Sequence, residues 1–157
     1  MGLSGWHPGE FTVQTKLGYD RPMRMGYLWV DDHLPIQHRL FHTKNLDMVP
    51  VTTLDSQERP WGSILSDGGT RGFITSPEDD MLIITFSVID GDPIVENLAG
   101  VDESKKLIAG LGIEFPTRRR NKFSGQITKV RRVNSSIELT LHVNQAIGYA
   151  HILYICY

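Results

Sequence analysis

Short apolar segments separated by turn residues are the feature that most limits what this chain can fold into. From Met48 onward, turn signals recur about every ten residues, and the segments between them are rich in β-branched residues. Met81 to Val88 is one such segment, and Ser76 to Asp80 before it is a turn. This spacing leaves no room for the helical crossovers of βαβ units, so it predicts an antiparallel barrel or sandwich.

Two further patterns indicate antiparallel strands. Val49 to Leu54 and Trp61 to Leu65 are apolar runs on either side of the polar turn Asp55 to Pro60, which predicts a β-hairpin. Ile137 to Val143 alternates apolar with polar residues, which predicts a strand with one buried face. Strands are also expected at Leu111 to Phe115 and at Phe123 to Val133.

Helices are expected to be few and short. Leu34 to Thr43 has roughly helical spacing, and Pro35 suits only a first turn, so one short helix is predicted there. Asp92 to Ala109 is the helical candidate of the second half, because Asp92 can cap it and Pro93 suits its first turn. Gly100 is expected to split this helix.

Composition narrows the class of protein. The chain of 157 residues with 40% hydrophobic content suits one domain, with an N-terminal extension (residues 1–45) and a barrel (residues 46–157). Its 16 basic and 18 acidic residues leave a net charge of −2, so neither nucleic acid nor an anionic membrane is an expected partner. No signal peptide or spanning segment is visible, and the single cysteine, Cys156, favours a reducing, cytoplasmic compartment.

Four short motifs occur in order along the chain. They are Trp6 to Glu10 (WHPGE), the hairpin Thr53 to Asp55 followed by Arg59 to Ser63, Gly72 to Pro77 (GFITSP), and Arg118 to Arg120. With these motifs the chain resembles the pyridoxamine 5′-phosphate oxidase-like family of FMN-binding split barrels, over residues 6–148. It is most similar to the branch that opens with His-x-Gly-Glu and carries Thr-Arg-Arg-Arg before a glycine.

The resemblance implies a fold, a cofactor and a function. The expected fold is mainly β, a six-stranded antiparallel split β-barrel with a few short helices. The expected assembly is a homodimer with FMN at its interface, acting as an oxidoreductase on a small-molecule substrate. The residues that the resemblance assigns to the cofactor are Trp61, Ser63, Ile64 and Leu65 near the flavin ring, Thr85, Asp92 and Pro93 near the ribityl chain and phosphate, and the cluster Arg118, Arg119 and Arg120.

Each of these assignments has an ordinary structural alternative. Arginine side chains suit a dianionic phosphate, but a run of three on a strand or turn also occurs on plain solvated surfaces. Trp61 and Ser63 are two residues apart on an expected strand and so share one side, where they either flank a flavin or pack in the core. Ser63 lacks the Gly-x-Ser-x-Gly elbow of a hydrolase nucleophile.

The histidines carry weaker signals. His7 and Glu10 are weak catalytic candidates as an acid–base pair, and equally a packed imidazole and a capping carboxylate near a chain end. His38 and His42 have the spacing of metal ligands on one helix face, but no third ligand is recognisable, so no metal site is predicted.

The end of the chain departs from the family pattern and leaves the function open. The branch reads Gly-Asn-Cys-Pro-Lys-Tyr-Ile where this chain reads Gly148 to Ile155 (GYAHILYI), so the family's lysine is missing. One alternative is therefore a flavin-free barrel that serves as an isomerase, cyclase or binding protein for an apolar metabolite. Another is a dimeric flavin carrier without turnover.

Overall fold

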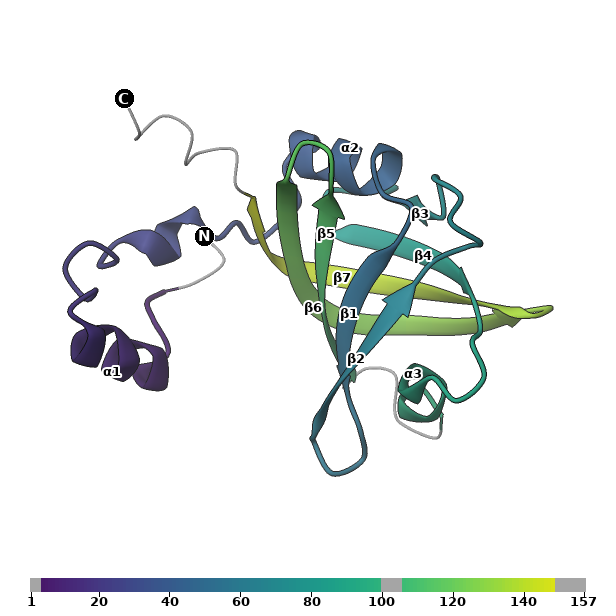
Figure 1. Cartoon of the computed structure of the whole chain (residues 1–157), viewed down its shortest axis with the longest axis horizontal. Helices are drawn as coiled ribbons and strands as arrows, with labels where there is room; N and C mark the ends of the chain where they lie inside the picture. The colour runs from purple at the N-terminus through teal and green to yellow at the C-terminus, as the bar shows by residue number, and fades with distance from the viewer. Residues whose placement is uncertain (1–3, 100–105, 149–157) are drawn as a thin grey trace.

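The computed structural model describes residues 4–99 and 106–148 of the chain. Seven strands form one antiparallel sheet in the order β2-β1-β5-β6-β7-β4-β3, and this sheet curls on itself (Figure 1). The strands are β1 (Val49–Leu54), β2 (Pro60–Leu65), β3 (Ile74–Thr75), β4 (Met81–Ser87), β5 (Lys106–Glu114), β6 (Arg119–Val133) and β7 (Ser136–Gly148). The helices are α1 (Pro8–Leu17), the 3₁₀-helix η1 (Gly26–Trp29), α2 (Ile36–Lys44) and α3 (Pro93–Asn97).

The core occupies the inner face of the curled sheet. On β7, Ile137, Leu139, Leu141 and Val143 are each at most 1% exposed, while Glu138 between them points the other way. The alternation predicted for this strand is therefore confirmed. Facing strands add Val49, Val51, Leu82, Ile84, Phe86, Ile108, Phe123 and Ile127 to the same core.

Two β-bulges bend the long β6–β7 hairpin and let the sheet curl. Asn144 stands unpaired where Ser124 pairs with Gln145 but Gly125 pairs with Val143, and a second irregularity lies at Thr128. Each extra residue shifts the alternation of its strand by one, so side chains beyond the bulge change faces. For this reason Gln145 lies on the outer face although Val143, two residues earlier, is in the core.

The predicted fold class is confirmed, with a difference in strand number. The sheet has seven strands where six were expected, because the two residues Ile74 and Thr75 pair with β4 as a short separate strand. The hairpin of β1 and β2 has the predicted turn, and α2 begins after Pro35 as the sequence indicated. Among the described helices, none is both long and apolar enough to cross a membrane.

The prediction of a helix from Asp92 to Ala109 holds over Pro93 to Asn97 and is wrong over Lys106 to Ala109, while residues 100–105 between them lie outside the described chain. Asp92 does cap a helix, accepting a hydrogen bond from the Ile94 backbone N–H at 2.9 Å, but α3 ends at Asn97. Lys106 to Ala109 belong to β5, where pairing with β6 exposes alternate residues instead of one helical face. Tertiary pairing has here overridden the helical spacing of the apolar residues. Gly100 lies outside the described residues.

An additional helix, α1, lies in the N-terminal extension, where no helix was expected before Leu34. Pro8 occupies its first turn, and the Nδ1 atom of His7 accepts a hydrogen bond from the backbone N–H of Gly9 at 3.1 Å. The helix ends at Gly18, whose φ of +74° is the left-handed conformation that glycine adopts at low cost. Figure 1 shows α1 well apart from the barrel.

Candidate functional site

A groove of about 870 Å³ lies on the outer face of the sheet, across β2, β1, β5, β6 and β7. Val30, where the N-terminal segment reaches β7, lines one end of the groove. Ile89 and Asp92, in the connection from β4 to α3, line the other end. The groove is therefore bounded by chain segments at both ends and by five adjacent strands beneath.

The floor of the groove consists of two neighbouring rows of outward-facing residues. Each row consists of residues that lie side by side on adjacent strands, so it runs across the strands and not along them. The small row is Gly62, Thr52, Ala109, Ser124 and Gln145, on β2, β1, β5, β6 and β7 in that order. The lysine row beside it is Ile64, Pro50, Leu111, Lys122 and Ile147 on the same strands, with Pro50 one residue beyond the last printed β1–β5 pair, Val51 and Gly110.

These rows give the floor its shape and its chemistry. Five strands about 4.8 Å apart make a floor roughly 19 Å across. At the β2 end of the small row, Gly62 has no side chain, and a Cβ atom added there would meet no heavy atom within 4 Å. At the β6–β7 end, the Ser124 hydroxyl donates to the Gln145 side-chain carbonyl at 3.2 Å. Among the described residues that line the groove, Asp92 and Lys122 are the ionisable ones.

A short hydrogen bond fixes the end of the groove near α3. The hydroxyl of Ser63 donates to Oδ1 of Asp92 at 2.6 Å, and the same oxygen accepts from the Ile94 backbone. Ser63 is 7% exposed and faces inward from β2, while its neighbours Gly62 and Ile64 face the groove. The pair therefore ties the loop before α3 to strand β2 and holds the wall of the groove in place.

Three of the predicted cofactor residues, Ser63, Ile64 and Asp92, line this groove. Leu65 is 1% exposed in the core. Thr85 lies on β4, outside the five strands of the groove, where it pairs with Glu138 of β7. Neither residue is part of the lining. Pro93 is the first residue of α3.

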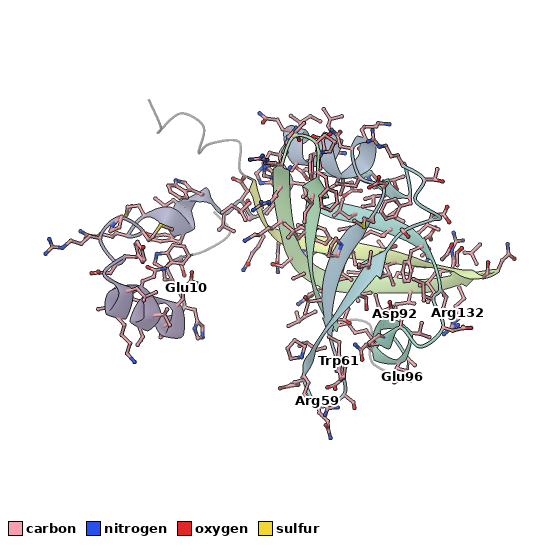
Figure 2. All side chains as sticks on the ribbon, viewed as in Figure 1. Glu10, Arg59, Trp61, Asp92, Glu96 and Arg132 are labelled. Atoms are coloured by element: carbon pink, nitrogen blue, oxygen red, sulfur yellow. The ribbon has the colours of Figure 1, made fainter. Side chains whose placement is uncertain are left out.

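Trp61 lies at the tip of the β1–β2 hairpin and not over the groove floor (Figure 2). Its indole N–H donates to Oδ2 of Asp55 at 2.9 Å, and the same carboxylate accepts from Arg59. These hydrogen bonds hold the pKa of Asp55 well below its usual range, with the Trp61 indole as the largest cause. Trp61 is thus fixed as part of a hairpin turn and is 42% exposed.

The three arginines diverge. Arg118 lies in the turn before β6, with a φ of +60°. Arg119 turns toward α2, where its guanidinium carbon is 4.9 Å from the centre of the Phe41 ring and its Nη2 donates to the Gln37 carbonyl. Arg120 is on the outward face of β6, which it shares with Lys122 by the alternation of the strand.

The weak catalytic candidates lie elsewhere. His7 caps α1, and Glu10 is exposed in the first turn of that helix, far from Asp92 and Trp61 in the barrel (Figure 2). His42 is 1% exposed beneath α2, between the rings of Phe41 and Phe123. Burial lowers the pKa of His42 to about 3, so its imidazole is neutral at physiological pH.

The sequence interpretation missed most of the floor. It selected Arg118 to Arg120 because three positive charges are adjacent there. Side chains alternate between the two faces of a strand, so Lys122 and Ser124 lie on the same face as Arg120. The strand was predicted from Phe123 to Val133, and the same period-two pattern, started at Arg120, would have placed Lys122 and Ser124 on its outward face. Gln145 was beyond reach, because the bulge at Asn144 places it on the outer face.

Comparison with known proteins bears on the fold. No protein-family model matches the chain, and neither does any curated protein. A solved structure from Lactobacillus delbrueckii, provisionally assigned as a pyridoxamine 5′-phosphate oxidase, aligns with a TM-score of 0.52 at 12% identity, over 74% of this chain and 94% of that one. HupZ of Group A Streptococcus aligns with a TM-score of 0.53 at 13% identity, over 75% and 96% of the two chains. The chain has the split-barrel fold of these proteins.

This split barrel is the fold implied by the resemblance of its motifs, and that prediction is confirmed. At these identities the likeness concerns the course of the backbone. What the split barrel binds has to be argued from the residues of its own groove.

Proposed function

We propose that this split barrel is an FMN-dependent oxidoreductase that acts on a small molecule, with the flavin lying in the outer groove at a homodimer interface. The observation that carries the proposal is the pair of rows across five strands, with the short side chains of Gly62 and Ala109 in one row and a cation in the other. A fused planar ring needs space over short side chains, and a phosphate needs a cation with hydrogen-bond donors.

The donor set of the groove fits FMN. The absent side chain of Gly62 and the small side chain of Ala109 leave space for a planar ring over β2, β1 and β5. Lys122 lies toward the other end, where it would hold the phosphate, and Arg120 shares its face. Arg119 is already engaged with α2, so this proposal gives the phosphate to Lys122 first.

The protein's own contribution is to bind and orient. Bound FMN would supply hydride and electron transfer, which no side chain can provide. Asp92 is held by Ser63 and by the start of α3, so it stabilises the wall of the groove beside the ring position. His7 and Glu10 lie away from the groove of their own protomer, so we assign them no proton-transfer role there.

A homodimer is part of the same proposal, because the groove is open on the side away from the sheet. A ligand lying on the floor would be covered by protein on one face, whereas cofactor sites bury most of their ligand. A second copy placed over the groove would supply the missing cover. The partner in this proposal is therefore the chain itself, and the substrate is a small molecule that enters beside the flavin.

The test uses the visible spectrum and a matched pair of lysine variants. The purified protein should show flavin absorption, or gain it on reconstitution with FMN. Lys122→Ala should weaken FMN binding about 10- to 100-fold, since a charge-assisted hydrogen bond is worth about 1.5–3 kcal/mol. Lys129→Ala, on the same strand but outside the groove, should bind FMN like the wild type. Equal FMN affinity in both variants would reject this phosphate site.

Turnover separates an enzyme from a flavin carrier. With FMN bound, the protein should oxidise a reduced nicotinamide and pass the electrons to a small acceptor. A protein that holds FMN firmly but remains oxidised in excess reduced nicotinamide would be a carrier.

A second candidate follows from the single lysine in the described lining. Pro50, Ile64, Leu111 and Ile147 make the lysine row mostly apolar, which also suits an apolar metabolite in a flavin-free barrel. A colourless protein that FMN cannot reconstitute, and that instead binds apolar ligands in the groove, would favour this candidate. In that case Lys122→Ala would leave ligand affinity nearly unchanged.

A further inference from the structure

The N-terminal residues 4–30, which we call the arm, form a folded unit outside the barrel. The indole N–H of Trp6 donates to the Met23 carbonyl at 2.9 Å, and the Trp6 ring meets Tyr27 edge to face at 6.1 Å. Gly26 is buried against Trp6 and Met23, since a Cβ there would lie 3.0 Å from Trp6 and 3.1 Å from Met23. These contacts give the arm a small core of its own.

The arm nevertheless leaves a large apolar surface uncovered. Within the described chain, α1 makes no extensive packing contact with any strand, and it lies apart from the barrel in Figure 1. A unit of this size cannot bury enough surface to be stable alone. Its large apolar side chains are between 40% and 64% exposed: Phe11, Val13, Leu17, Tyr19, Met25, Leu28 and Trp29.

The barrel carries a second uncovered apolar surface, on the outer face of the sheet. Ile64 is 53%, Ile89 is 58% and Leu107 is 51% exposed, and all three lie on or beside the groove. Apart from Val30, the described arm lies away from this face in its own chain. Asp31 pairs with Ala146 through two backbone hydrogen bonds of 2.8 Å, which fixes where the arm leaves the barrel and directs it outward.

From these two surfaces we infer that the arm of each protomer packs on the outer sheet face of a second copy and closes the groove of that copy. The inference deepens the proposed homodimer and does not depend on the flavin. Val30, the last residue of the arm, lines the edge of the groove, so the arm and the open face are continuous. A two-fold axis places each arm on the face of the other copy, so both apolar surfaces of both chains are covered.

The areas agree with such an exchange. Half-exposed side chains of this size each offer on the order of 80–100 Å², so the arm offers on the order of 600–700 Å². The three side chains on the sheet face add on the order of 250 Å² by the same measure. Each protomer contributes both surfaces to a two-fold exchange, so this sum is the upper limit of its apolar share of the roughly 800 Å² per partner that a stable specific interface buries. The arm carries charges of both signs, Glu10 and Asp20 against Lys16, Arg21 and Arg24.

Complementation between two variants of the full chain tests the exchange. The arm variant is Phe11→Glu with Leu17→Glu, and the face variant is Leu107→Glu, which lies outside the groove lining. The control, Gln57→Glu with Thr70→Glu, adds the same charge as the arm variant at exposed turn positions. Sedimentation velocity and native mass spectrometry of the FMN-free proteins measure the dimer dissociation constant, and circular dichroism confirms that each is folded.

We expect the wild type and the control to be dimers at micromolar concentration. Each single variant should dissociate at least about tenfold more readily, because charge replaces buried apolar contact. An equal mixture of the arm and face variants should form a heterodimer more tightly than either variant pairs with itself. In that heterodimer one intact arm meets one intact face, whereas each homodimer has neither contact complete.

Three results would overturn the inference. They are a monomeric wild type, variants that dimerise as well as the control, and a mixture with no gain over its components. The last result would mean that arms pair with arms and faces with faces. Because these measurements need no flavin, a protein that never binds FMN but passes them would refute the proposed function alone. A protein that binds FMN as a monomer would refute the exchange and the dimeric part of the proposed function, and would leave FMN binding in the groove intact.

Discussion

The two faces of the same five strands follow different rules. On the inner face the neighbours dictate the residue: a Cβ at Gly110 would lie 2.2 Å from the Phe123 ring, so nothing larger than glycine fits there. On the outer face Gly62 has nothing within 4 Å, although it too is a strand glycine. The inner face is therefore determined by packing, and the outer face is free to be shaped by a ligand or a partner.

Gly125→Ala, on the inner face, is the variant expected to lower stability most, and it tests the difference between the two faces. Its Cβ would lie 2.0 Å from the backbone carbonyl oxygen of His142, beside the β6–β7 bulge, where no side-chain rotation can relieve the clash. We expect a loss of at least about 4 kcal/mol in unfolding free energy, or failure to fold. Gly62→Ala is the control and should unfold at nearly the wild-type urea concentration. Near-native stability of Gly125→Ala would show that the bulge is not as tight as described.

Two neighbours on β7 give the next largest contrast. Leu141 is 0% exposed in the core, and His142 beside it is 50% exposed and paired with Asp80 at 3.2 Å. Leu141→Ala should cost about 3 kcal/mol through lost burial and a residual cavity. His142→Ala should cost less than about 1 kcal/mol, because exposed ion pairs contribute little. Urea unfolding of both variants measures this difference, and similar losses in the two would contradict the assigned faces.

The fold was predictable from sequence where local pattern and packing agree. The β1–β2 hairpin has a polar turn between two apolar runs, and β7 alternates in register with its buried face. Prediction failed at β5, where the cap at Asp92 and the spacing of Ile94 and Leu98 suggested a helix that continues to Ala109. Pairing with β6 decides the structure there, and a non-local contact of this kind leaves no local signal.

The candidate site was less predictable than the fold, for a related reason. Ser63, Ile64 and Asp92 were assigned from motif resemblance and do line the groove. The floor, however, arises from register across five strands, and the Asn144 bulge changes the face on which Gln145 lies. A single unpaired residue is invisible in a sequence yet moves every side chain beyond it to the other face. The sequence motifs therefore identified residues at the edge of the groove, and the strand pairing seen in the structure was needed to identify its floor.

A smaller effect concerns the histidine enclosed on the inner side. Burial lowers the pKa of His42 to about 3 from an ordinary value of 6.5, with His38 and Arg119 adding to the effect. Between these two values the unfolded chain binds a proton that the folded chain does not, so stability falls as the pH falls from 6.5 toward 3. Above pH 6.5 this group contributes no pH dependence.

The slope for one such proton is about 1.4 kcal/mol per pH unit, which amounts to about 2 kcal/mol between neutral pH and pH 5. Urea unfolding at several pH values should show this decline in the wild type. His42→Leu cannot titrate, so its stability should decline less over the same range. Parallel pH profiles for the two proteins would mean that His42 becomes protonated without unfolding.

Gly62→Val is expected to change stability least, and it distinguishes an effect on packing from an effect on ligand binding at the outer face. Gly62→Val adds a branched side chain in open space on a strand, so its unfolding free energy should stay within about 0.5 kcal/mol of the wild type. The same branch would place a second β-branched side chain in the small row, beside Thr52, and narrow the space for a planar ring there. FMN affinity measured by fluorescence titration should fall about tenfold, and Gly62→Ala should fall less because it adds one carbon. If Gly62→Val is stable and binds FMN like the wild type, the ring lies elsewhere on the barrel. If Gly62→Val instead loses about 2 kcal/mol of unfolding free energy, the outer face is packed like the inner one.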